Sequence, residues 1–170
     1  QAAVSSSWQA MERGEQPKAV HFAQINERDG FFICGREPER RFSWGSLAGK
    51  SILVDVAAQP LAMFRYATHR MGLDYSEIQV VDAGGVDEMV AAFGSGLGDY
   101  VHLQGPYAQQ LRRDGTGFVV ASVGEAIGPV AFSSLVASPR WLESDIAKAF
   151  TRAYGASRRW VNEAQPSEIA

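Results

Sequence analysis

Short apolar runs recur through the middle of the chain. Those with the character of buried strands are residues 51–56, 78–81, 100–103 and 117–122. Apolar residues at spacings of three and four predict a helix after each of the first three runs: residues 60–71, 86–93 and 106–113. Strands alternating with short helices predict an α/β fold built of βαβ units, with a mostly parallel sheet and right-handed crossovers.

The first 35 residues follow a different pattern. Residues 2–13 predict a helix that ends at Gly14. Alternating apolar residues then predict strands at 18–25 and 31–35. Because only a polar turn separates these two strands, we expect them to pair as a hairpin.

After residue 122 the pattern changes again. Residues 130–136 predict one more strand, and residues 142–162 a long amphipathic helix. Five residues form the predicted apolar face of this helix: Ile146, Ala149, Phe150, Ala153 and Trp160. The alternation is therefore complete only in the middle of the chain.

Composition narrows the function classes. The chain has 170 residues, 46% of them hydrophobic, and a net charge of −3, which suits a globular protein with a sizeable core. Nucleic acid binding would require a basic face, so we expect no nucleic-acid partner. Cys34 is the single cysteine and lies in an apolar run, which predicts a buried, inert thiol. No signal peptide, membrane-spanning run or lipidation motif is visible in the sequence.

Candidate catalytic residues are sparse. His21, His69 and His102 are scattered, and none has the spacing of a metal site, so a structural role is expected for each. The glycine-rich residues 94–98 follow a helix and precede a strand, whereas a phosphate-binding loop requires a strand followed by a helix. We therefore expect no enzyme activity, no cofactor and no metal.

Two loops between a strand and a helix are candidates for ligand binding. One contains Ala57, Ala58 and Gln59, and the other contains Gln104, Gly105, Pro106 and Tyr107. In open α/β sheets, ligands bind at the carboxyl ends of strands, where helix N-termini present backbone N–H groups. Gln59 and Gln104 add neutral amides. From these residues alone, ordinary connecting loops remain an equal alternative.

Several segments, in this order and spacing, resemble the type 2 periplasmic binding-protein superfamily. Within it they resemble the substrate-binding proteins for sulfonates, nitrate and thiamine-precursor pyrimidines. The segments are residues 28–37, 44–50 (the pattern W-x-x-L-x-G-K), 71–74 (with G-L), 89–100 (ending in G-x-x-D-Y), 104–106 and 154–169.

The resemblance implies two α/β lobes joined by hinge strands, with a small solute between them. The expected domains are residues 1–35 as part of the first lobe, 36–122 as a complete second lobe, and 123–170 as the return to the first. Gln1, Ser5 and Ser6 would then lie near the ligand. Compared with the family, an opening strand–helix–strand and later helices are missing, so we expect that the chain is truncated at both ends.

The family's function would make the chain the monomeric solute-binding component of an ABC importer. It would act outside the cytoplasmic membrane and dock on the transporter permease. The solute would be small and polar or anionic, of the sulfonate, nitrate or pyrimidine class. Two alternatives remain: an enzyme on the same fold, of the pyrimidine or menaquinone biosynthesis type, and the effector-sensing domain of a transcription regulator.

Overall fold

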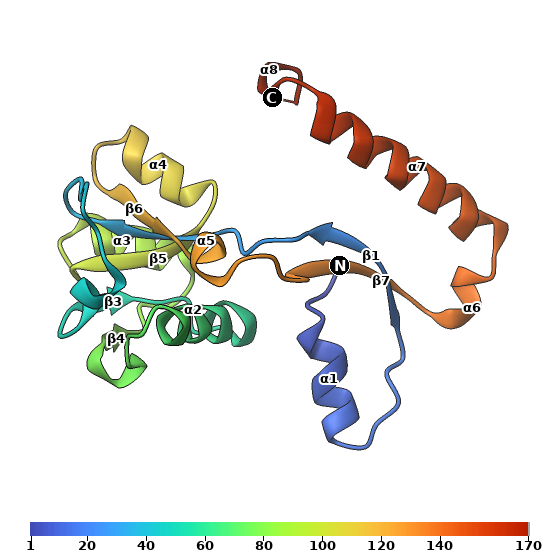
Figure 1. The fold of residues 1–170 in the computed structure, drawn as a ribbon, viewed down its shortest axis with the longest axis horizontal. Helices are drawn as coiled ribbons and strands as arrows, with labels where there is room; N and C mark the ends of the chain where they lie inside the picture. Colours follow the sequence, from blue (N-terminus) through green and yellow to red (C-terminus); the bar gives the residue numbers. More distant parts are fainter. Residues whose placement is uncertain (170) are drawn as a thin grey trace. The chain divides into compact units, whose positions relative to one another are not determined.

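The computed structural model describes residues 1–169, without the side chains of Ser5, Ser6, Trp8 and Gln9. The chain divides into two compact units (Figure 1). The central unit comprises residues 27–132, and the terminal unit comprises residues 1–26 together with 133–170. The expected domain boundaries at 35/36 and 122/123 therefore differ from the observed division at 26/27 and 132/133. That the two units correspond to two lobes of a binding protein stays a prediction.

The central unit is built on a five-stranded sheet in the order β4-β3-β5-β2-β6. Its strands are β2 (Phe31–Gly35), β3 (Ser51–Leu53), β4 (Gln79–Val81), β5 (Tyr100–Gln104) and β6 (Phe118–Ser122). β3 pairs in parallel with β4 and β5, as predicted. β2 lies antiparallel between β5 and β6, which makes the expected parallel sheet incomplete.

The predicted hairpin of the first two strands is wrong. β1 (Val20–Asn26) pairs with β7 (Ser133–Ala137) in the terminal unit, whereas β2 belongs to the central sheet. The physical reason is burial. β2 is covered almost completely and needs a partner on each side, whereas β1 is only partly covered.

Helices cover both faces of the central sheet (Figure 1). They are α2 (Ala58–Arg70), α3 (Val86–Gly94), α4 (Tyr107–Arg113) and α5 (Val123–Ile127), with single 3₁₀ turns at Trp44–Leu47 and Tyr75–Glu77. Phe64 of α2 packs on one face with Ile33 and Ile52, and Phe93 of α3 packs on the other with Leu53 and Val101. This double coverage explains the continuous apolar runs. The short helix α5 was not predicted.

Arg36 stabilises the C-terminal end of α3, at the edge of the sheet where the parallel strands begin. The Arg36 guanidinium donates hydrogen bonds to the carbonyl oxygens of Phe93, Leu97 and Gly98, and it lies 3.8 Å from the centroid of the Phe93 ring. Gly98 has φ +75°, and a Cβ there would overlap Leu53. This edge is therefore fixed by structural contacts.

In the part of the terminal unit that the structure describes, the antiparallel pair β1–β7 is accompanied by helices α1 (Ser5–Glu12), α6 (Pro139–Leu142), α7 (Asp145–Glu163) and α8 (Pro166–Ile169). Ala2 forms an isolated antiparallel bridge with Ser134 of β7. The helix expected at 142–162 is observed as α7, which begins three residues later, and Leu142 instead ends the separate short helix α6.

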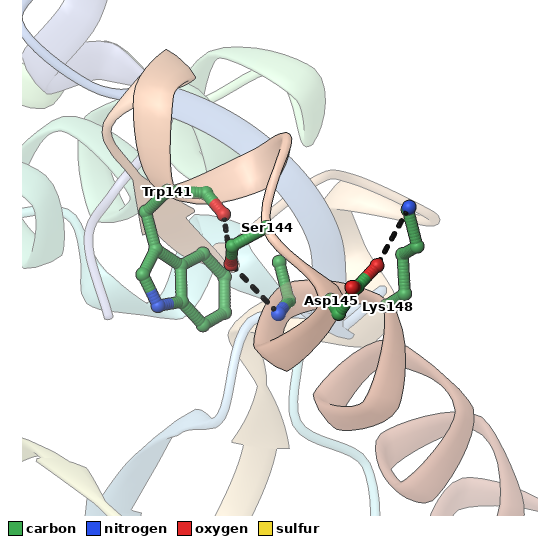
Figure 2. Close-up of polar contacts among 5 residues, drawn as sticks. Trp141, Ser144, Asp145 and Lys148 are labelled. Atoms are coloured by element: carbon green, nitrogen blue, oxygen red, sulfur yellow. Dashed lines mark hydrogen bonds and ion pairs between the residues drawn. The ribbon is translucent and has the colours of Figure 1, made fainter.

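Figure 2 shows why α7 starts where it does. The Ser144 hydroxyl accepts a hydrogen bond from the Ala147 N–H and donates one to the Trp141 carbonyl oxygen, 2.6 Å away. Asp145 pairs with Lys148 at 2.9 Å in the first turn, where a carboxylate is favourable. Serine at the N-cap is thus the local signal that separates α6 from α7.

The predicted apolar face of α7 is exposed in this chain. Ile146 is 71% exposed, Phe150 42% and Trp160 53%. The helix is held to β1 by other residues, because Tyr154 and Arg158 donate hydrogen bonds to the carbonyl oxygen of Gln24. The sequence pattern identified an amphipathic helix correctly, but within the described residues its apolar side stays largely exposed, with only Phe150 placed against the rings of Phe22 and Trp141.

Candidate functional site

The carboxyl ends of the parallel strands form one edge of the central sheet, which we call the carboxyl edge. β3, β4, β5 and β6 all end there, because they run in one direction, and the antiparallel β2 begins there. Helices α2, α3, α4 and α5 start from this edge. It is the position at which open α/β sheets bind ligands.

The first predicted loop lies between β3 and α2. Ala57 and Ala58 are exposed, and Gln59 is half-buried. The Asp55 carboxylate accepts a hydrogen bond from the Ala57 N–H at 2.9 Å, and the Gln59 amide donates to the Phe132 carbonyl oxygen at 2.5 Å. A carboxylate therefore already occupies the start of α2, one of the two places where a polar or anionic solute was expected to bind. Pro60 is the third residue of this helix and does not open it.

The second predicted loop lies between β5 and α4. Gln104, Gly105 and Pro106 are exposed, Tyr107 is half-buried, and the Gly105–Pro106 peptide bond is cis. The Gly105 N–H donates to the carbonyl oxygen of Gly30 at 3.2 Å, which ties the loop to the turn before β2. The Gln104 side chain lies over Gly30, where a Cβ would be 3.5 Å from its Nε2.

The structure places these two loops at the same edge, after neighbouring parallel strands, since Leu53 of β3 pairs with Val101 of β5. Gln1 belongs to the terminal unit, where it lines a cavity of about 400 Å³ together with Phe22, Trp141 and Phe150. Ser5 and Ser6 begin α1, and their side chains lie outside the described residues. That these three residues contact the same solute stays a prediction.

Asp29 is a candidate that sequence reasoning missed. It lies in the turn before β2 and is only 5% exposed. Its Oδ1 accepts a hydrogen bond from the Phe31 N–H at 2.7 Å, whereas its Oδ2 is buried without a hydrogen-bond partner. Burial raises the pKa of the Asp29 carboxyl to about 6, and the hydrogen bond from Phe31 partly opposes this rise. The sequence shows a turn containing Asp-Gly here, and nothing in that pattern indicates burial.

The histidines do not form a catalytic group. His102 is fully buried, its ring is stacked 4.5 Å from that of Phe31 and 5.1 Å from that of Phe64, and neither ring nitrogen has a partner. Burial lowers the pKa of His102 to about 3, so the ring is neutral. His21 contacts the Ser7 hydroxyl in the terminal unit, and His69 is exposed on α2. Among residues 1–169, no group of three or more His, Cys, Asp or Glu side chains is arranged to hold a metal ion.

The sequence comparisons give one clear relative. No protein-family model matches the chain. It is 30% identical, over 161 residues, to the putative binding protein YtlA of Bacillus subtilis (strain 168). The match covers 92% of the chain and 48% of that protein, so the chain spans about half the length of this relative.

Solved structures show the same fold. The periplasmic aliphatic sulphonate binding protein SsuA of Escherichia coli is similar over 86% of this chain and 48% of its own, with a TM-score of 0.69 and 19% identity. The putative periplasmic sulfonate-binding protein of Methylobacillus flagellatus KT is similar over 99% of this chain and 58% of its own, with a TM-score of 0.66 and 17% identity. Both likenesses confirm the expected type 2 periplasmic-binding-protein fold. None of the helices in residues 1–169 has the length and apolar character required to cross a membrane.

Proposed function

We propose that this chain, which has the type 2 periplasmic-binding-protein fold, is part of the solute-binding component of an ABC importer. The observation that carries the proposal is the pair of loops containing Gln59 and Gln104, which follow neighbouring parallel strands at the carboxyl edge. The named binding functions of YtlA and of the sulfonate-binding proteins support it. Such a component acts outside the cytoplasmic membrane as a monomer and delivers its solute to a permease.

The proposed solute contacts in the central unit are Ala57, Ala58 and Gln59 in one loop and residues 104–107 in the other. The exposed Gln104 amide suits a small polar solute, because it offers a donor and an acceptor without a charge, whereas the half-buried Gln59 amide already donates to the Phe132 carbonyl oxygen. Gln1, Ser5 and Ser6 are proposed contacts from the terminal unit.

The charges at the carboxyl edge bear on the solute class. Asp55 and Asp82 accept hydrogen bonds from the backbone at the starts of α2 and α3, and α3 carries Asp87 and Glu88 in its first turn. These carboxylates disfavour a bare anion such as nitrate. Among the expected classes, they favour a pyrimidine, or a sulfonate that also carries a hydrogen-bond donor.

The test is a binding screen on the 170-residue chain. Sulfonates, nitrate, pyrimidines and aromatic acids are added singly, and melting temperature and isothermal titration heat are recorded. A binding protein gives a ligand-dependent rise in melting temperature and leaves the solute chemically unchanged. If no solute binds to this chain or to a longer form containing it, the proposal is wrong. Conversion of a bound solute, followed by mass spectrometry, would instead establish the enzyme alternative.

A further inference from the structure

Four aspartates in the central unit adopt the same local turn. In each, Oδ1 accepts a hydrogen bond from the backbone N–H two residues later: Asp29 from Phe31, Asp55 from Ala57, Asp74 from Ser76, and Asp82 from Gly84. The four oxygen–nitrogen distances lie between 2.7 and 3.0 Å. The turn itself is therefore satisfied in every case, and it does not distinguish one aspartate from another.

Burial separates Asp29 from the other three. Asp74 and Asp82 are exposed and Asp55 is partly exposed, so water reaches their second oxygens. Asp29 is 5% exposed, and its Oδ2 has no hydrogen-bond partner. A buried, unpaired carboxylate oxygen is costly, and a turn at the surface would provide the same backbone hydrogen bond without that cost.

The backbone contacts of Asp29 and of its neighbour Gly30 place this turn at the carboxyl edge. Its neighbour Gly30 accepts the hydrogen bond from Gly105 in the β5–α4 loop, and the exposed Gln104 side chain lies over Gly30. On the other side, a Cβ at Gly124 would overlap the Asp29 carbonyl oxygen, so α5 begins directly against this turn. Asp29 thus lies between two of the loops that start from the proposed binding edge.

We propose that Asp29 is a ligand-selecting residue, whose unpaired Oδ2 accepts a hydrogen bond from an N–H group of the solute. The solute then carries a nitrogen donor, such as an ammonium, an amidinium or an amino group on a ring. This inference rests on the proposed solute-binding function and narrows it. A solute of this kind supplies a partner for Oδ2, and the exposed Gln104 side chain lies over the adjacent Gly30.

The chemistry favours a charged nitrogen donor over a neutral one. A hydrogen bond between an ionised carboxylate and a cationic donor is shorter and about twice as strong as one between neutral groups. The raised pKa of Asp29 agrees with a carboxyl group that lacks such a donor, since a bound cation would favour its ionised form. The carboxylates at the starts of α2 and α3 also favour a cationic solute over an anionic one.

The test uses pairs of solutes that differ in a nitrogen donor: taurine with ethanesulfonate, β-alanine with propionate, and benzamidine with benzoate. Each is titrated calorimetrically into the wild-type chain, into Asp29→Asn and into Asp74→Asn. Asp74→Asn is the matched control, because it alters the same turn at the opposite edge of the sheet. Asp29→Ser, whose hydroxyl also accepts the Phe31 N–H, replaces Asp29→Asn if that variant does not fold.

We expect the nitrogen-bearing member of at least one pair to bind the wild-type chain about tenfold more tightly than its partner or better. Asp29→Asn should remove that preference, and Asp74→Asn should retain it. If solutes bind but the preference is absent, or survives in Asp29→Asn, the role of Asp29 is refuted while the binding function stands. If no solute in these pairs or in the wider screen binds the wild-type chain, both proposals fail.

Discussion

The central and terminal units differ in how completely they bury their apolar residues. The central unit has a buried cluster on each face of its sheet, and Phe64, Ile33, Phe93 and Leu103 are all fully buried. In the terminal unit a two-stranded pair carries α7, whose predicted apolar face is exposed. The central unit therefore has a complete hydrophobic core of its own, whereas the terminal unit gains less of its stability from the burial of apolar side chains.

The two units should differ most in how much stability is lost when an apolar side chain is removed. Phe64→Ala deletes a fully buried side chain that contacts Trp44, Tyr75 and His102, so we expect a loss of about 3–5 kcal/mol in the free energy of unfolding. Ile146→Ala on α7 removes a side chain that is 71% exposed, so it should change that free energy by less than about 0.5 kcal/mol. Urea denaturation measures both. Equal losses would mean that α7 is packed as tightly as α2.

The buried carboxyl of Asp29 should oppose the stability of the central unit. Its pKa is raised from 3.8 to about 6, so its ionisation costs stability as pH rises through this range. At pH 7.5, Asp29→Asn should therefore stabilise the chain by up to about 3 kcal/mol. Asp82→Asn, at an exposed turn of the same kind, should change stability by no more than about 0.5 kcal/mol. A destabilised Asp29→Asn would show that the ionised carboxylate is satisfied in the folded chain.

His102 should add an acid-dependent loss of stability. Its pKa falls from 6.5 to about 3 on folding, so the unfolded chain takes up the proton first and stability falls as pH drops below about 6.5. Between pH 7.5 and 5 the loss from this group is about 2 kcal/mol. As the pH falls over the same range, protonation of the buried Asp29 carboxylate increases stability, so the two effects partly cancel in the wild-type chain.

The effect of His102 is therefore measured in the Asp29→Asn background. There, unfolding experiments at a series of pH values should show the full loss, and adding His102→Leu should flatten the profile. A slope that is the same with and without His102 would show that its ring is accessible to protons in the folded chain.

Local patterns in the sequence predicted most of the elements of the central unit. The runs at 51–56 and 100–103 predicted β3 and β5, and the helix expected at 60–71 corresponds to α2. A buried strand and a half-buried helix each leave a clear apolar period in the sequence. Pairing was harder to predict. β1 and β2 are adjacent in the sequence, yet each pairs with a distant strand. Asn26 of β1 pairs with Ser133, which is 107 residues away, and Phe31 of β2 pairs with Gln104, which is 73 residues away.

The candidate site was predictable only in part. Gln59 and Gln104 could be found because a polar residue between an apolar run and a proline indicates a loop between a strand and a helix. Asp29 could not, because the segments that pack against its turn lie far along the chain: Gly124 lies against Asp29 itself, and Gly105 bonds to the adjacent Gly30. For α7 the amphipathic pattern was visible, but whether its apolar face is covered depends on what packs against it and not on its own sequence.

The most direct test of the account is a map of the bound solute on the central unit. The ¹⁵N-labelled chain is titrated with the solute that binds best in the screen, and backbone amide shifts are followed by NMR. We predict the largest shifts at residues 57–59, at Gln104, Gly105 and Tyr107, and at residues 29–31, all at the carboxyl edge. Shifts confined to the opposite edge, at Gly35, Lys50 and Arg112, would contradict the account.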